Sequence, residues 1–368
     1  MVRFSALLST TIAVAAGGFA LAHSPLDHEF ERNARRSLGS CSSQYSRRDG
    51  LADRAMVRRQ SLADQIRKAR PLKRDLATVL ATDHQSNLTG LTNNTDPATI
   101  FTNNTCVLAP EGEEGPYMVD GEYVRQDLRE SQEGIPVYLD LQLVDVNTCD
   151  PVSDVYIDIW SCNATGVYAG VVASGNGDSS DLSNINATFL RGIQKTDDEG
   201  VVQFITLFPG HYSGRTVHVH LVAHQSANGT LFDNGTYVGN VASHIGQMFF
   251  DQDLITQVEA TYPYSLNTED LTTNADDRVV ATEADGGQDP VVEYVLLGDT
   301  LDEGIFAWTS VAINTSAIYD FTPAAWLYAD GGVTVSSGDS SAGGGDISMS
   351  GVPTGSMSGA LPSGSVSA

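Results

Sequence analysis

The sequence predicts an all-β protein whose core is an antiparallel β-sandwich, with an N-terminal helical arm before it and a disordered Ser/Gly-rich C-terminal tail after it. Three observations predict this fold. Short runs of alternating apolar and polar residues recur within residues 106–335, separated by turns rich in Gly, Pro, Asn and Asp. Residues 23–74 are basic and show helical periodicity. Residues 336–368 are rich in Ser and Gly and offer few side chains that could pack in a core.

The first 22 residues match a secretory signal peptide. Arg3 supplies the positive charge, a mostly apolar run follows from Ala6, and Ala20-Leu21-Ala22 matches a cleavage site. The apolar run is too short for a membrane span, and no later stretch is long enough to supply one. We therefore expect a secreted, extracellular protein without a membrane partner.

Sequons and cysteines agree with this compartment. A high density of Asn-x-Ser/Thr sequons after a signal peptide is typical of an extracellular glycoprotein. The cysteines are even in number and fit no zinc pattern, so we expect structural disulfides, with three connectivities open. The sequons lie at Asn87, Asn93, Asn103, Asn163, Asn186, Asn228, Asn234 and Asn314, and the cysteines are Cys41, Cys106, Cys149 and Cys162.

The charge of the chain is unevenly distributed. Residues 1–74 carry 14 of the 20 Lys and Arg residues but only 6 of the 46 Asp and Glu residues. Residues 75–368 therefore hold 6 basic and 40 acidic side chains, a formal net charge of −34. Such a body repels nucleic acids and anionic membranes, so neither is an expected partner.

The basic segment of residues 23–74 ends in the dibasic pair Lys73-Arg74. Two interpretations stay open for it: a pro-segment that is cut off after Arg74, or a helical arm that stays attached. The second is favoured, because cleavage would separate Cys41 from the other three cysteines. The apolar positions that recur at near-helical spacing are Leu51, Ala55, Leu62, Ile66 and Ala69.

The rest of the chain divides into a linker, a strand-rich domain and the tail. Residues 75–105 are polar and carry sequons, which indicates a glycosylated linker. Residues 106–335 hold the predicted strands. The strands are expected at residues 137–145, 155–160, 201–206, 217–222, 247–250, 291–297 and 306–313. Residues 336–368 lack the hydrophobic end of a lipid-anchor signal.

The most informative stretch runs from Phe208 to His220 and contains a Tyr, an Arg and two His residues. Side chains two residues apart on a strand share a face. His218 and His220 can therefore bind one metal ion, while Val217 and Val219 face the core. A His-x-His pair alone is weak evidence for a metal site, and the neighbouring Tyr and Arg strengthen it.

Residues 106–316 contain several further motifs in a fixed order. They are Glu114-Gly115-Pro116-Tyr117, Asp145–Pro151, Ile159–Cys162 followed by Gly166-Val167-Tyr168, Phe189–Gly192, Pro209–His220 and Ser243–Phe250. Together these motifs resemble the intradiol ring-cleaving dioxygenases, especially their secreted fungal branch.

The resemblance implies one non-haem Fe(III) ion per chain, held by Tyr168, Tyr212, His218 and His220. The chemistry of these donors agrees, because phenolate oxygens suit a hard trivalent cation and imidazoles complete a mixed ligand set. A bound cation also stabilises deprotonated tyrosine ligands.

The reaction that the resemblance implies inserts both atoms of O2 into a catechol-type ring and produces a cis,cis-muconate-type diacid. Tyr212 would leave the metal and take up a substrate proton. Arg215 would stabilise negative charge on the ring, and Gln247 would lie near the rearranging substrate. Tyr117 is a candidate for the substrate pocket, with simple packing as its alternative.

The identity of the catechol stays open. The resemblance also allows a homodimer formed through the helix of residues 48–70. We expect His211 and His244 to be structural or to support the metal ligands from behind. Two other functions stay open as well. One is a non-catalytic secreted binding or surface glycoprotein on the same fold. The other is a histidine-brace copper protein, in which cleavage after Ala22 would make His23 the N-terminus.

Overall fold

The computed structural model describes residues 54–55, 57–59, 61–62, 105–106, 115–148, 150–239, 241–283, 290–298, 300–328 and 331–334. Several sequence predictions lie outside these residues. They are the signal peptide of residues 1–22, His23, Cys41, most of the basic arm, the cleavage site after Arg74, the linker up to residue 104 with its three sequons, Cys149 and the tail of residues 336–368.

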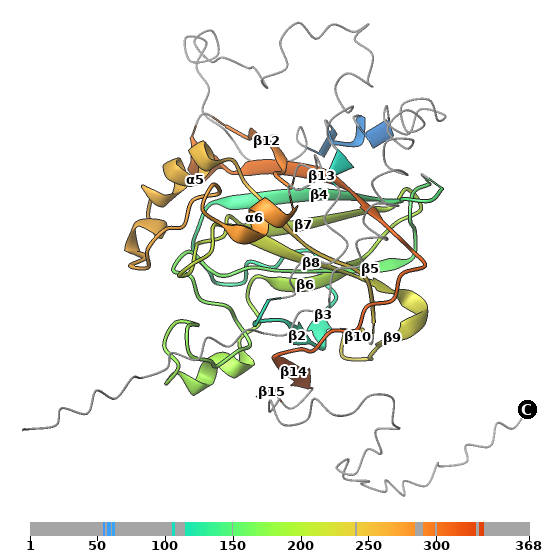
Figure 1. Cartoon of the computed structure of the whole chain (residues 1–368), viewed down its shortest axis with the longest axis horizontal. Coiled ribbons are helices and arrows are strands. Elements are labelled where there is room, and N and C mark those ends of the chain that lie inside the picture. The colour runs from blue at the N-terminus through green and yellow to red at the C-terminus, as the bar shows by residue number, and fades with distance from the viewer. Residues whose placement is uncertain are drawn as a thin grey trace, which may run out of the picture. The chain divides into compact units, whose positions relative to one another are not determined.

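Two large sheets form the centre of the described structure, and Figure 1 shows them as adjacent layers. The first sheet has the order β1 (Thr105–Cys106), β13 (Ile305–Ile313), β4 (Pro136–Asp145) and β7 (Val201–Leu207), and β12 (Glu293–Leu296) also pairs with β13. The second has the order β11 (Ala242–Phe249), β8 (His218–Gln225), β5 (Val155–Trp160) and β6 (Arg191–Lys195). The predicted β-sandwich is confirmed.

Smaller elements cover the edges and the outer face of the second sheet. One three-stranded sheet has the order β3 (Glu122–Tyr123), β10 (Thr236–Gly239) and β9 (Gly229–Leu231), and another has β15 (Gly331–Thr334), β14 (Ala325–Tyr328) and β2 (Val119–Asp120). The helices are α5 (Gln252–Glu259) and α6 (Arg278–Glu283), with 3-10 turns η1 (Leu182–Asn186), η2 (Ser226–Asn228), η3 (Tyr264–Leu266) and η4 (Leu301–Glu303).

The main core fills the space between the two large sheets. Alternate side chains of β4, β7 and β13 meet alternate side chains of β5 and β8, and the apolar face of α5 closes one end. A second cluster of buried side chains lies on the other face of the second sheet and includes Trp160, Val222 and Ile245. The second sheet is therefore covered on both faces, so polar groups on its outer face can be shielded from water.

The pairing of β4 with β13 differs from the predicted antiparallel pattern. These two strands run parallel over their whole length, from Val137 beside Ile305 to Asp145 beside Ile313. The chain between them is more than long enough to return to the same end of the sheet, as a parallel pairing requires. The other pairings within the two large sheets are antiparallel, except that of the short β1 with β13.

One expectation for the cysteines is wrong. Cys162 is buried and free, and its thiol donates a hydrogen bond to the carbonyl oxygen of Gly210 at 3.3 Å. Because this thiol lies in the second buried cluster directly after β5, it is part of the packing and takes no part in a disulfide.

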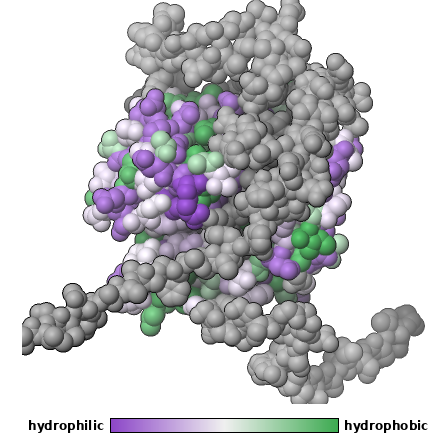
Figure 2. All heavy atoms as spheres, in the orientation of Figure 1, coloured by the Kyte–Doolittle hydropathy of each residue, from purple (hydrophilic) through white to green (hydrophobic). Residues whose placement is uncertain are grey.

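The coloured part of Figure 2 is mostly hydrophilic, and hydrophobic residues occur there in small separate groups. Among the described residues, no helix has the length and the apolar character that crossing a membrane would require.

Part of the predicted arm is helical. Residues 54, 55, 57–59, 61 and 62 have helical backbone conformation, and they lie against the outer face of the first sheet (Figure 1). This position, on the far side of that sheet from the main core, separates the arm from the second sheet.

Core packing yields a direct stability prediction. Leu141 is completely buried in β4, so Leu141→Ala should lower the free energy of unfolding by about 2–5 kcal/mol through lost burial and a cavity. Leu182→Ala is the matched control, because Leu182 is 73% exposed and its truncation should change this energy by less than about 0.5 kcal/mol. Urea unfolding measures both, and equal losses for the two variants would contradict the packing.

Candidate functional site

The outer face of β8 presents the two predicted histidines. Val217 and Val219 point into the main core, and His218 and His220 point to the opposite face, as the alternation of a strand requires. Both histidines are almost completely buried. The register of the sheet places Trp160 of β5 beside His220, and the two rings stack with centroids 4.8 Å apart and planes 2° apart. This stacking restricts the orientation of the His220 ring.

Three ring donors converge above this face. The Tyr168 hydroxyl lies 3.2 Å from Nε2 of His218, and the two histidine Nε2 atoms lie 3.1 Å apart. Tyr168 is completely buried and comes from the irregular segment that follows β5. The structure therefore brings a tyrosine 50 residues away in sequence to the histidine pair.

The protonation state of His218 leaves the lone pair of its Nε2 free to bind a metal ion. Nδ1 lies 2.6 Å from the carbonyl oxygen of Thr216, an acceptor that requires the proton on Nδ1. Burial and the nearby positive charge of Arg215 lower the pKa of His218 to about 3. The ring is therefore neutral, and Nε2 directs a lone pair toward Tyr168 and His220.

The second predicted tyrosine ligand lies in the loop between β7 and β8. The Tyr212 ring is half-buried, with its centroid 5.5 Å from that of Tyr168 and 5.6 Å from that of His218. Tyr117 completes the group, with its ring 4.9 Å from Tyr168 and 5.8 Å from Tyr212. All four predicted ligands and the candidate pocket tyrosine thus lie in one cluster.

The environment of the tyrosines keeps them protonated unless a cation is present. Burial raises the pKa of Tyr168, and the neighbouring phenol of Tyr212 raises it further. Burial also raises the pKa of Tyr212 to about 12, although the charge of Arg215 acts in the opposite direction. A bound cation reverses this balance, because it stabilises the phenolate far more than burial destabilises it.

The donor set fits a metal ion. Separations of 3.1 and 3.2 Å between Tyr168 Oη, His218 Nε2 and His220 Nε2 are typical of donors that share one cation at bond lengths of about 2.0–2.2 Å. Among the described residues, no three His, Cys, Asp or Glu side chains form a metal-binding group. A site here must therefore include tyrosines, and mixed phenolate and imidazole donors favour a hard, highly charged transition metal.

Arg215 is held rigidly beside this cluster. Its Nε donates to Oδ2 of Asp277 at 2.8 Å, and its Nη2 donates to Oε1 of Gln247 at 2.5 Å. Gln247 is fully buried on β11, directly opposite His220 in the register. The predicted Arg215 and Gln247 are thus connected to each other and to the histidine strand.

Asp277 is a residue that sequence reasoning missed. Its Oδ1 accepts the backbone N–H groups of Val279 and Val280 at 2.8 and 3.1 Å, so it caps the start of α6, and its Oδ2 binds Arg215. Burial raises the pKa of Asp277, but the charge of Arg215 outweighs this and leaves the pKa below its usual value. An Asp just before a helical run is a helix-cap signal, so its structural role was detectable from the sequence.

Two asparagines that the sequence did not single out hold the backbone of Tyr168. Oδ1 of Asn176 accepts the N–H of Tyr168 at 2.7 Å, and its Nδ2 donates to the carbonyls of Tyr168 and Val171 at 2.9 and 2.8 Å. Nδ2 of Asn184 donates to the same two carbonyls at 2.9 and 2.8 Å. These bonds satisfy backbone groups that have no strand-to-strand hydrogen bonds in an irregular segment.

Arg191, from one of the sequence motifs, binds the backbone next to Tyr168 and the backbone of Tyr117. Its guanidinium is buried and donates to the carbonyl oxygens of Ala169 and Tyr117 at 2.8 and 2.6 Å, and to Oε1 of Glu122 at 3.2 Å. Arg191 thereby joins the segment of Tyr168 to that of Tyr117.

Gly115 explains why its motif requires glycine. Its φ is +74°, and a Cβ at this position would lie only 2.7 Å from Cε1 of His220. The backbone near Tyr117 therefore passes close to the Cε1 edge of the His220 ring.

His211 and His244 were expected to be structural or to support the metal ligands from behind. His211 binds Glu259 through Nδ1 at 2.8 Å and the carbonyl oxygen of Glu269 through Nε2 at 3.0 Å. His244 is buried on β11, and burial lowers its pKa to about 3. Both placements agree with the expected structural roles.

Comparisons with known proteins find similarity among solved structures. No family model matches the sequence, and no curated protein matches it. An intradiol ring-cleavage dioxygenase from Tetranychus urticae has 30% sequence identity, covers 58% of this chain and 97% of its own, and has a TM-score of 0.48. The dioxygenase domain of a carbohydrate-binding fusion protein from Streptomyces sp. SirexAA-E has 20% identity, covers 55% and 96%, and has a TM-score of 0.32. Catechol 1,2-dioxygenase from Acinetobacter sp. ADP1 has 18% identity, covers 58% and 64%, and has a TM-score of 0.35.

The asparagine clamp yields a graded prediction. Asn176→Ala removes three hydrogen bonds to buried backbone groups, so it should lower the free energy of unfolding by about 2–4 kcal/mol. Asn184→Ala should cost less, because Asn176 still donates to both carbonyl oxygens. Urea unfolding of the metal-free protein measures both. A larger loss for Asn184→Ala would contradict the assigned roles.

Proposed function

We propose that this chain is an extracellular non-haem Fe(III) intradiol dioxygenase that inserts both atoms of O2 into a catechol-type aromatic ring. The product is a cis,cis-muconate-type diacid. Every atom of catechol and O2 is retained in this product, so the reaction requires no external reductant.

The convergence of Tyr168, His218 and His220, with Tyr212 beside them, carries this proposal. Two phenolates and two neutral imidazoles would hold Fe(III), whose charge the phenolates largely neutralise. When bound, the iron makes the ring of a chelated catechol reactive toward O2. Trp160, stacked on His220, and Thr216, bound to Nδ1 of His218, keep the imidazoles in the orientation that this binding needs.

The two tyrosines have different roles in this proposal. Tyr168 is completely buried and clamped through its backbone, which suits a permanent ligand. Tyr212 is half-buried in a loop, which suits a ligand that leaves when the substrate arrives. Away from the metal, burial raises the pKa of Tyr212 above its usual value, so its phenolate can take a proton from a catechol hydroxyl. Tyr212 thus acts as both ligand and base.

Arg215 supplies a fixed positive charge to the same reaction. Asp277 and Gln247 hold the guanidinium in place before the substrate binds, so no reorganisation is needed when negative charge develops on the ring. Gln247, fully buried opposite His220, would orient the substrate ring as it rearranges. Tyr117, packed against both tyrosine ligands, would contact the substrate ring and affect which catechol is accepted.

The proposal includes secretion. The signal peptide of residues 1–22 supports it, and two of the sequon residues, Asn186 and Asn234, are exposed as glycosylation requires.

A visible spectrum of the purified protein tests the ligand set. Fe(III) bound by tyrosinates should produce a visible absorption band that shifts when catechol is added without oxygen. Tyr168→Phe and Tyr212→Phe should each weaken the band, and the control Tyr156→Phe, in a buried tyrosine that packs against Tyr237 and outside the donor cluster, should leave it unchanged. A protein that stays colourless after iron is supplied would overturn the ligand assignment.

Oxygen consumption with catechol tests the activity and the role of Arg215. Arg215→Met should lower the turnover rate by about 10²–10³-fold, because it removes a preorganised charge next to the reacting ring. The control Arg129→Met, whose arginine pairs with Asp127 at the surface, should keep full activity. Iron-loaded protein that binds catechols without consuming oxygen would instead favour a binding protein.

A further inference from the structure

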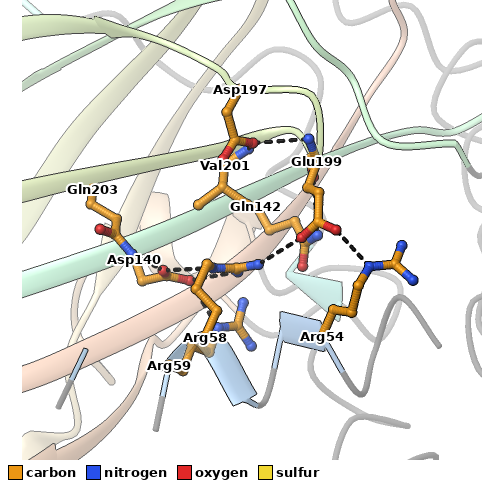
Figure 3. A network of polar contacts seen from close by, with 9 residues as sticks. All are labelled: Arg54, Arg58, Arg59, Asp140, Gln142, Asp197, Glu199, Val201 and Gln203. Atoms are coloured by element: carbon orange, nitrogen blue, oxygen red, sulfur yellow. Dashed lines mark hydrogen bonds and ion pairs between the residues drawn. The ribbon is translucent and has the colours of Figure 1, made fainter. Parts of the chain in front are cut away.

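The arginines of the N-terminal arm contact the first sheet on the face opposite the main core. Arg58 and Arg59 point toward Asp140 of β4, and Arg54 points toward Glu199 in the turn before β7 (Figure 3). This contact joins a basic segment to the strongly acidic body of the chain.

Asp140 is the centre of the contact. Its carboxylate is completely buried, and it accepts Nε of Arg59 at 2.8 Å, Nη2 of Arg58 at 3.1 Å and Nε2 of Gln203 at 2.8 Å. Burial raises the pKa of Asp140, but the charges of Arg59 and Arg58 outweigh this and leave it below its usual value. The carboxylate is therefore charged. It also accepts Nε of Arg58 at 3.3 Å, so three of these four hydrogen bonds come from the arm.

Glu199 is the second acidic residue of the contact, and hydrogen bonds fix the backbone of its turn. Its backbone N–H donates to Oδ1 of Asp197 at 2.9 Å, and its carbonyl oxygen accepts Nε2 of Gln142 at 3.1 Å. Its carboxylate then pairs with Nε of Arg54 at 2.6 Å and with Nη1 of Arg58 at 3.6 Å. Arg58 thus bridges both acidic residues.

Apolar burial accompanies these ion pairs. Ala55 is 1% exposed and Arg59 is 6% exposed. Leu62 packs against the cluster formed by Leu297 and Phe306. The arm is therefore partly buried against the first sheet, as an integral element of the fold would be.

We propose that the described arm residues 54, 55, 57–59, 61 and 62 belong to a permanent strap of the folded protein, which stays bound without a covalent link when the chain is cut after Lys73-Arg74. The basic segment is then no disposable pro-segment. Cleavage produces a two-chain protein held together by Arg58 and Arg59 on Asp140. The proposal does not depend on the ring-cleaving activity, and metal-free protein is sufficient for its test.

The test uses the full chain with Lys73-Arg74 replaced by the recognition sequence of a site-specific protease. Cys41→Ser is included so that no disulfide can hold the two pieces together. After cleavage, size-exclusion chromatography and native mass spectrometry show whether the arm elutes with the body. Retention of the arm is the expected result, and its loss from the wild-type contact would overturn the proposal.

Two arm variants and one control in the body rank the ion pairs. Arg59→Ala should weaken retention by about 100-fold or more, because it removes one partner of a buried charge. Arg54→Ala should weaken it by less than about 5-fold, because its side chain is 52% exposed. Arg129→Ala, in a surface pair within the body, is the matched control and should have no effect. Equal effects of Arg59→Ala and Arg54→Ala would overturn the assigned centre of the contact.

A peptide exchange assay keeps the proposal testable if Arg59→Ala prevents folding. A labelled synthetic peptide of residues 48–70 should replace the arm on the cleaved protein, and the same peptide with Arg59→Ala should compete about 100-fold more weakly. Equal competition by the two peptides would overturn the proposal.

Discussion

The candidate site depends on the two faces of one strand. Along β8, alternate residues enter the main core, and this burial fixes the strand in the sandwich. The residues between them, His218 and His220, must then point to the other face at a set spacing, where the second buried cluster excludes water. A change of register by one residue would bury the histidines in the apolar core and expose the valines. Packing therefore specifies the face to which both candidate donors point.

Other residues of the candidate site come from irregular segments and need a different support. Tyr168 and Arg215 lie outside the strands, so no ladder of backbone hydrogen bonds positions them. Buried polar side chains take over this role: Asn176 clamps the backbone of Tyr168, and Asp277 holds the guanidinium of Arg215. A buried polar group costs free energy unless all of its hydrogen bonds are formed. Because these side chains form theirs, they hold the two loops rigid.

Several features were predicted because they depend on local patterns. The strands β4, β5, β7 and β8 follow from alternation of apolar and polar residues, and the structure has them within about three residues of the expected bounds. Strand β6 was missed, because Gly192, Gln194 and Lys195 interrupt the apolar pattern of an edge strand. The free thiol of Cys162 was also missed, because an even number of cysteines carries no information about which of them meet in space.

The sequence by itself determined the strand composition of the core, the direction of His218 and His220, and the residue types of the candidate metal site. These depend on side-chain period and on motif, which are local. Only the tertiary structure decided that Tyr168 approaches His218, that β13 lies parallel to β4, and that Arg59 of the arm reaches Asp140. Each of these contacts joins residues far apart in the chain, and such pairings are selected by the packing of the whole fold, where a buried charge or donor must find its partner.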